Sequence, residues 1–215
     1  TDMGVNMAGN CICDDEVCKE ASRQEIIRRY YNALNGLVYG TSTEEEVMKI
    51  ELIMKQVGVS KTDRQVVNAA LKRSEETDGP AAAMELEDGT IVTGKTTDLL
   101  GASAALLLNA LKILAGIDHK KKVISPAAIR PIQKLKTEYL GSRNPRLHTD
   151  EVLIALSTSA ENNPDAQAAL AQLPKLAGCQ VHTSVLLSSV DIKTFKRLSI
   201  QFTSEPVYES KRIYH

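Results

Sequence analysis

Two stretches of the sequence carry residues that could do chemistry, and the first runs from Gly89 to Thr96. It reads Gly-Thr-Ile-Val-Thr-Gly-Lys-Thr, which matches the letters of a phosphate-binding loop, GxxxxGK[ST]. In such a loop, flexible middle residues present backbone N–H groups to phosphate. Here all four middle residues are β-branched and favour a strand, and Gly89 follows Asp88 in a typical hairpin turn. These features argue against a nucleotide-binding loop.

A weaker form of the same idea concerns Gly94, Lys95 and Thr96, which stand where a strand ends and a buried helix begins. Helix N-termini attract anions, and ligands of α/β proteins gather at strand ends. We therefore predict that these three residues contact an anionic ligand. The alternative is that Lys95 is a surface lysine and that Thr96 only caps the helix.

The second stretch, from Ser142 to Glu151, is the densest polar cluster of the chain. Arg143, Asn144 and Arg146 could bind a carboxylate or a phosphate, because guanidinium groups hold both in a bidentate manner. We expect loops at one end of a sheet to share a crevice, so that Arg143 and Arg146 lie near one cleft with Lys95.

Three side chains are candidates for catalysis, namely His148, Asp150 and Lys95. His148 or Asp150 would exchange a proton with a ligand held by the lysine and the arginines in the shared cleft. The alternative is a structural corner, in which Asp150 and Glu151 pair with both arginines.

A zinc site could be assembled from Cys11, Cys13, Cys18, Cys179 and His182. The spacing is not that of a usual zinc knuckle, and the two halves lie far apart in the sequence. We therefore predict no metal site and no cofactor. Free cysteines in a chain of this size indicate a reducing, cytoplasmic location.

The composition excludes several classes of protein. The formal net charge is −1 and the pI is about 6.4, so no electric field attracts nucleic acid or an anionic membrane. Tryptophan is absent, and no apolar run reaches the length of a membrane span. With 215 residues and a 43% apolar share, the chain is long enough to form a real core. We therefore predict that neither nucleic acid nor a membrane is a partner of this protein.

The candidate residues are positioned by the stretch from Ala81 to Ile117. It reads as a strand, a tight Asp88-Gly89 turn, a second strand and a helix that is apolar on every side. A helix of that kind is buried, so residues 99–114 form the centre of the predicted core. Thr96 or Thr97 is the expected cap of this helix.

Three amphipathic helices precede this stretch and predict a helical subdomain over residues 1–78, whose first helix ends at Asn35-Gly36. Residues 79–215 predict an α/β/α domain with a mixed sheet of about five strands. The elements expected after the central helix are a strand at 123–124, helices at 126–141, 149–163 and 166–176, a strand at 181–187, a helix at 191–198 and a strand at 200–203.

Four long phrases of the sequence resemble one family: MGVNMAGNCICDDEV, SRQEIIRRYYNAL, ELEDGTIVTGKTTDLLGASAALLLNALKILAGI and IQKLKTEYLGSRNPRLHTDEVLIALSTSAENNP. It is the domain of unknown function 1846 family, also catalogued as uncharacterised protein family 0371. The resemblance covers nearly the whole chain. Members are longer and carry an α/β region before Thr1, so the resemblance implies a C-terminal portion. The lack of an initiator methionine suggests the same.

The resemblance also implies a three-layer fold similar to that of the cytidine deaminases. In zinc deaminases, H-x-E opens the first helix and P-C-x-x-C opens the second. Here no histidine precedes Asp98, and Ala127 and Arg130 follow Pro126 where cysteine ligands would stand. The resemblance therefore implies a deaminase-type scaffold without zinc deaminase chemistry.

The leading functional hypothesis is the ligand-binding or catalytic half of a larger cytoplasmic enzyme. Its ligand would be a polar small molecule, phosphorylated or otherwise anionic. The competing hypothesis is a structural or oligomerisation module, with the chemistry in the missing N-terminal region. As partners we expect the N-terminal domain of the same protein and a second copy of the chain in a homo-oligomer.

Overall fold

A computed structural model describes residues 15–209, and the chain divides into two units at Arg64 and Gln65. The first unit contains the described residues up to Arg64, and the second contains the remainder. Cys11 and Cys13 lie outside the described residues.

The first unit is a helical hairpin of α2 (Asp15–Tyr39) and α3 (Glu44–Val57), followed by a short 3₁₀ turn, η2 (Lys61–Asp63). Thr43 and Glu46 form a capping box at the start of α3. The Thr43 hydroxyl accepts the Glu46 N–H, and the Glu46 carboxylate accepts the Thr43 N–H, which satisfies two N–H groups that the helix cannot pair itself.

The first helix is longer than predicted. Asn35-Gly36 was expected to end it, but α2 continues to Tyr39, and the chain turns at Gly40 with φ of +71°. Gly36 has a packing role instead, because a Cβ atom there would lie 2.2 Å from the Ser42 Oγ. The glycine allows the turn to fold back closely on the helix.

The second unit contains a mixed sheet with the order β2-β1-β3-β4. Its strands are β1 (Ala81–Glu85), β2 (Ile91–Lys95), β3 (Gln180–Thr183) and β4 (Gln201–Ser204). β1 pairs antiparallel with β2 and β3, whereas β3 and β4 are parallel. The predicted hairpin is confirmed, with Gly89 at φ of +81° in its turn.

The sheet has four strands among the described residues, where about five were expected. Val123 and Ile124, predicted as a strand, are instead an irregular buried segment with exposures of 1% and 5%. The Asn163 amide donates to the Val123 carbonyl at 3.3 Å, so a side chain satisfies the backbone group that a neighbouring strand would otherwise pair.

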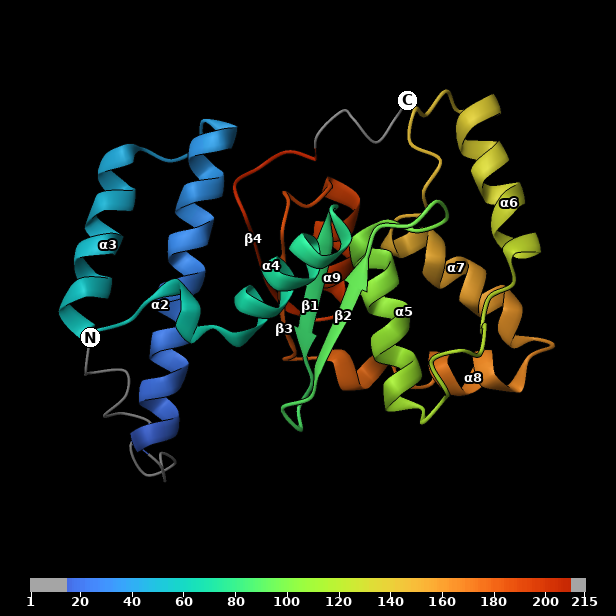
Figure 1. The fold of residues 1–215 in the computed structure, drawn as a ribbon, viewed down its shortest axis with the longest axis horizontal. Coiled ribbons are helices and arrows are strands. Elements are labelled where there is room, and N and C mark those ends of the chain that lie inside the picture. The colour runs from blue at the N-terminus through green and yellow to red at the C-terminus, as the bar shows by residue number, and fades with distance from the viewer. Residues whose placement is uncertain (1–14, 210–215) are drawn as a thin grey trace. The chain divides into compact units, whose positions relative to one another are not determined.

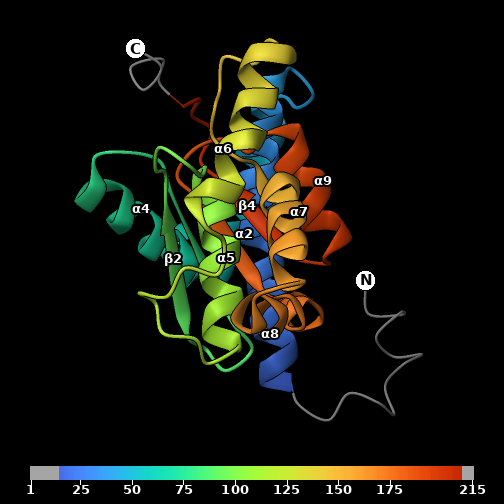
Figure 2. The same ribbon diagram turned by 90° about the vertical axis from the view of Figure 1, so that its right-hand side faces the viewer.

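Helices cover both faces of this sheet (Figures 1 and 2). α4 packs against β1 on one face, although the sequence pattern placed it with the helical subdomain, and α5 packs against β2 and β1 on the other. α7 and α8 lie outside α5. The helices of this unit are α4 (Gln65–Thr77), α5 (Ala102–Leu114), α6 (Pro126–Lys134), the π-helical η3 (Leu135–Tyr139), α7 (Thr149–Ala160), α8 (Pro164–Leu170), the 3₁₀ turn η4 (Leu173–Leu176) and α9 (Ser189–Arg197).

The core centres on α5, as its apolar sequence predicts. Leu106, Leu107 and Leu111 are fully buried, and burying each side chain contributes about 1.5–3 kcal/mol. α5 lies unusually close to β2, because a Cβ atom on Gly94 would stand 2.3 Å from the Leu106 backbone nitrogen. The helix begins later than expected, at Ala102, so that residues 96–101 form a loop.

Candidate functional site

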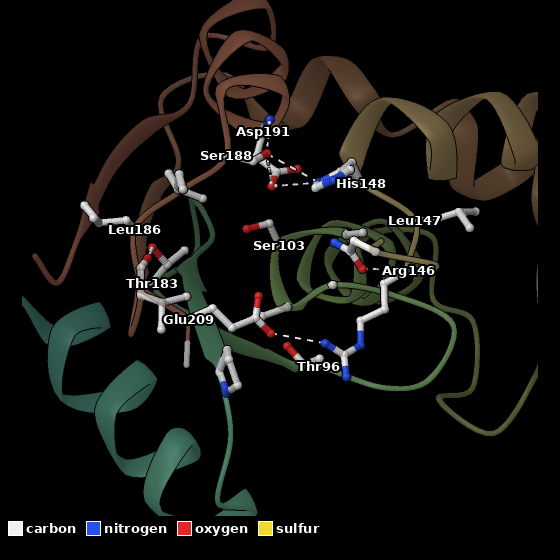
Figure 3. Close-up of a pocket in the computed structure, with 17 residues that line it drawn as sticks. Thr96, Ser103, Arg146, Leu147, His148, Thr183, Leu186, Ser188, Asp191 and Glu209 are labelled. Atoms are coloured by element: carbon white, nitrogen blue, oxygen red, sulfur yellow. Dashed lines mark hydrogen bonds and ion pairs between the residues drawn. The ribbon is translucent and has the colours of Figure 1, made fainter. Parts of the chain in front are cut away.

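The candidate site is a pocket in the second unit with a cavity volume of about 90 Å³, which we call the His148 pocket (Figure 3). It lies at the end of the sheet where β2 and β3 finish. Its walls come from the start of α5, the segment before α7 and the segment between β3 and α9. The pocket therefore brings together three helix starts that are remote in the sequence.

His148 is the N-cap residue of α7 and faces Asp191 in the first turn of α9. Its Nδ1 lies 3.4 Å from the Asp191 Oδ2, a long contact. The hydrogen bond to Asp191 raises the pKa of His148 above its ordinary value, and this effect outweighs burial, which would lower it. The imidazolium form is therefore favoured.

Asp191 is held as a carboxylate by several donors. Its Oδ1 accepts the Thr149 N–H at 3.0 Å and the Thr149 hydroxyl at 2.9 Å, and its Oδ2 accepts the Ser188 hydroxyl at 2.7 Å. Burial alone would raise the pKa of Asp191, but the hydrogen bonds from His148, Ser188 and Thr149 bring it below the ordinary value. A charged Asp191 thus fixes the orientation of the imidazole.

Ser188 is a helix cap rather than a nucleophile. Its Oγ accepts the Asp191 N–H at 3.1 Å and lies 3.3 Å from the His148 Nδ1. In a serine–histidine–acid relay, the serine and the acid contact opposite nitrogens of the imidazole. Here both contact Nδ1. The Nε2 atom makes no hydrogen bond to any residue that the structure describes and is available for a ligand.

Arg146 is buried in the wall of the same pocket. Its Nε donates to the Thr97 carbonyl at 2.9 Å, and its Nη1 lies 3.1 Å from the Glu209 Oε1 (Figure 3). Backbone bonds join the two loops that meet here, since the Gly101 N–H donates to the Leu147 carbonyl at 3.1 Å. The guanidinium is thereby fixed at the pocket, with a carboxylate already against it.

The buried Lys136 stabilises the segment that carries Arg146 and His148. The Lys136 Nζ donates to the Arg146 carbonyl at 2.5 Å and to the Glu151 Oε2 at 2.7 Å, and the same Oε2 accepts the His148 N–H at 2.8 Å. Glu151 therefore pairs with Lys136 in the interior of the loop, while Arg146 reaches Glu209. The π-helical segment η3 positions this lysine.

The structure brings together part of the set that the sequence singled out. Four of those residues line the pocket: Thr96, Asn144, Arg146 and His148. Four others are not among the lining residues: Gly94, Lys95, Arg143 and Asp150. Lys95, Arg143 and Asp150 have exposed side chains, and Gly94 is the point of close packing between β2 and α5.

Several pocket residues carried little or no signal in the sequence. Ser103, Ser188 and Glu209 were not singled out, and Asp191 appeared only as the first residue of the helix expected at 191–198. Ser188 and Asp191 have the spacing of a capping box. The apolar residues 185–187 just before them read as the continuation of a strand, so the helix start was not recognised at Ser188. β3 ends at Thr183, whose hydroxyl donates to the Val185 carbonyl at 2.7 Å and turns the chain.

The residues considered for zinc are not gathered into a metal site in the described part of the chain, where no group of three or more potential ligands lies together. Cys18 is exposed, and Cys179 is buried with a raised pKa, chiefly because burial disfavours the thiolate. His182 is fully buried and bonded to side chains of β4 and of the residue after it. Within residues 15–209, no helix is both long and apolar enough to span a membrane.

Comparison with known proteins places the chain in a family. Residues 62–214 match the C-terminal domain of unknown function DUF1846, and residues 1–58 match the N-terminal DUF1846 domain. The change from one match to the other falls near the division between the two structural units.

Relatives in two bacterial genera support the assignment. A UPF0371 protein of Corynebacterium urealyticum is 56% identical over 214 residues, and one of Streptococcus thermophilus is 49% identical over the same length. In both comparisons the alignment covers 100% of this chain and 43% of the relative, so the chain spans less than half the length of these proteins. The resemblance predicted from the sequence is confirmed, and the chain belongs to the DUF1846 family, also named UPF0371.

Proposed function

We propose that the His148 pocket binds an anionic group of a polar small molecule and that His148 exchanges a proton with that ligand. One observation carries this proposal. The Nδ1 of His148 is held by the carboxylate of Asp191, while Nε2 has no partner among the described residues and the ring lines a pocket.

This arrangement suits general acid–base catalysis. A general acid works best when its pKa lies near the ambient pH, and the hydrogen bond to Asp191 raises the pKa of His148 above its ordinary value of 6.5. A positioned histidine of this kind contributes about 10²–10⁴-fold to a rate. Because Asp191 fixes the ring through Nδ1, proton exchange would occur at Nε2.

The remaining polar residues of the pocket would bind the ligand. Arg146, Asn144 and Thr96 line it together with the N-terminus of α5, whose dipole favours negative charge. Glu209 already places a carboxylate 3.1 Å from the Arg146 guanidinium, which marks a position suited to an anionic group.

We further propose that this chain is the ligand-binding or catalytic half of a larger cytoplasmic enzyme, since its relatives are more than twice as long. The deaminase-like scaffold is part of the proposal. It is supported by the order of a hairpin, a buried helix and a second helix that starts at Pro126. Ala127 and Arg130 replace cysteine ligands, so the proposed chemistry does not rely on deaminase zinc.

A structural or oligomerisation role is the second candidate. It is favoured by exposed apolar side chains on α3, where Met48, Leu52, Ile53 and Val57 are each between 44% and 59% exposed. A helix with such a face would pack against a second copy of the chain or against the N-terminal domain of the same protein. This role could coexist with a pocket in the other unit.

Thermal unfolding of the intact protein with a panel of small anionic metabolites tests the proposal. A ligand at 100 times its Kd stabilises a protein by about 2.7 kcal/mol. Ligands that raise the melting temperature would then be incubated with the protein and analysed by mass spectrometry. We expect the wild type to convert such a ligand and His148→Asn to leave it unchanged. Asn suits an N-cap position, so this variant keeps the helix start.

Lys95→Ala and Arg143→Ala are the matched controls, because both remove a positive charge outside the pocket lining. They should bind and convert the ligand as the wild type does. If no anion stabilises the protein, or if His148→Asn converts the ligand normally, the proposed role of the pocket is wrong.

A further inference from the structure

Ser103 is the most unusual polar residue of the His148 pocket. It is the second residue of α5 and is only 7% exposed, yet its hydroxyl makes no hydrogen bond to any described residue. Figure 3 shows the hydroxyl pointing into the pocket. The hydroxyl is open to the pocket, because it is not one of the enclosed side-chain atoms that lack a hydrogen-bond partner. A group that enters the pocket can therefore take the place of solvent as the partner of Ser103.

The start of α5 offers further unpaired donors beside this hydroxyl. The N-cap is Gly101, which has no side chain to accept a hydrogen bond, and the first helical N–H groups belong to Ala102, Ser103 and Ala104. None of these three donates to an acceptor in the described part of the chain. All three residues line the pocket. An open helix N-terminus of this kind binds anions through its N–H groups and its dipole.

The size of the cavity limits what can enter. Its volume of about 90 Å³ is smaller than the roughly 150 Å³ of a cavity that binds benzene. One small polar group fits, whereas a nucleoside or a sugar ring would have to remain outside. The enclosed group is therefore the head group of a ligand.

The charges around the cavity are balanced before a ligand binds. Asp191 is paired with His148, and Glu209 is paired with Arg146. An entering anion therefore meets the dipole of α5 without an uncompensated carboxylate. The donors also come from different elements, because Ser103 lies at the start of α5 and His148 is the N-cap of α7 (Figure 3). A tetrahedral oxyanion presents acceptors in all these directions, whereas a carboxylate presents them in one plane.

We propose that the His148 pocket binds the phosphoryl group of a small phosphate monoester, with the Ser103 hydroxyl and the N–H groups of Ala102–Ala104 as its ligands. This inference rests on the proposed function for the location of the ligand, but it concerns binding only. Ser103 is then a determinant of specificity for phosphate over carboxylate. The organic part of the monoester lies at the mouth of the pocket.

Binding of glycerol 3-phosphate, inorganic phosphate and acetate to the intact protein, measured by calorimetry, tests this assignment. We expect both phosphates to bind and acetate to bind at least tenfold more weakly. Ser103→Ala should weaken the binding of both phosphates about tenfold or more, since hydrogen bonds to charged groups are the stronger ones. Ser103→Asp should abolish it, because the new carboxylate occupies the anion position.

Ser103→Asp should remain folded, because an acidic residue in the first turn suits the helix dipole. The matched control is Ser189→Asp, which adds the same charge to the first turn of α9 at an exposed position outside the pocket lining. It should bind phosphate as the wild type does. Melting curves without phosphate establish that all variants are folded.

Unchanged phosphate binding in Ser103→Ala and Ser103→Asp would show an adventitious ion only and would overturn the assignment. If the pocket prefers acetate, or binds inorganic phosphate but no monoester, the phosphate-monoester assignment is also wrong. The proposed function would survive those results if His148→Asn still abolished the conversion of another anion. The converse outcome is that the protein binds phosphate through Ser103 and yet converts no ligand in a way that depends on His148. In that case the pocket would be a binding site, and the proposed catalytic role of His148 would be wrong.

Discussion

The starts of α5 and α9 face the same pocket but differ in how their polar groups are used. At α9, Ser188 caps the helix, and Asp191 accepts hydrogen bonds from Thr149, Ser188 and His148. At α5, no side chain caps the helix, and the Ser103 hydroxyl has no partner among the described residues. The comparison separates two tasks: the α9 start holds the histidine, and the α5 start is open to a ligand.

The largest expected effect comes from removing the acceptor at α9. Asp191→Ala would leave the buried Thr149 donors and the His148 imidazolium without their carboxylate. Breaking such a buried pair costs about 3–5 kcal/mol, measured as the free energy of unfolding in urea. Asp150→Ala is the control, because Asp150 is exposed in the first turn of α7 and should cost less than about 1 kcal/mol. Equal losses in both variants would contradict the anchoring role of Asp191.

A smaller effect distinguishes the two serines. Ser188→Ala removes a helix cap and should destabilise the protein by about 1 kcal/mol. Ser103→Ala removes a hydroxyl that makes no hydrogen bond to a described residue, so the free energy of unfolding should change by less than about 0.5 kcal/mol. The measurement is urea unfolding in buffer without phosphate. A loss in Ser103→Ala as large as that in Ser188→Ala would mean that the α5 start is not open.

A third expected effect is the pH dependence of the His148–Asp191 pair. The raised pKa of His148 means that its contribution is fully present below its ordinary value of 6.5 and is lost as the pH rises through the raised pKa. The lowered pKa of Asp191 means that the contribution of this carboxylate is present above 3.8 and is lost as the pH falls through the lowered pKa. Lys136 opposes protonation of His148, and Glu151 favours it.

We therefore expect the stability difference between the wild type and His148→Asn to be greatest between pH 4 and pH 6.5. It should decrease by about 1 kcal/mol above the raised pKa of His148. Urea unfolding across this range provides the measurement. A difference that grows with rising pH would show that the histidine is stabilised in its neutral form and would contradict the pairing.

Much of the fold could be predicted because its signals are local. Asp88-Gly89 specifies a hairpin turn, Thr43 with Glu46 specifies a capping box, and the apolar stretch that became α5 specifies a buried helix. The predictions of secondary structure were wrong where a tertiary contact overrode the local conformational preference of the residues. Val123 and Ile124 have strand character, but the Asn163 side chain satisfies a backbone group there and no strand forms.

Only some of the residues that line the pocket could be predicted from the sequence. The density of polar residues before α7 indicated Asn144, Arg146 and His148, and the loop after β2 indicated Thr96. The exposed Lys95 and Arg143 belong to the same motifs but do not line the pocket. A motif specifies residue types and not the direction of each side chain, which depends on where the backbone of each loop is anchored.

By itself the sequence determined the family, the α/β class, the hairpin and the buried position of α5, because each depends on residue identity or on a short-range pattern. The tertiary structure alone decided that Ser103, His148 and Asp191 line one pocket. These residues are separated by 45 and 43 positions, and no local preference relates them. The packing of α5 on β2 and of α9 on α7 brings their helix starts together, since burying the apolar faces of these helices fixes where their N-termini lie.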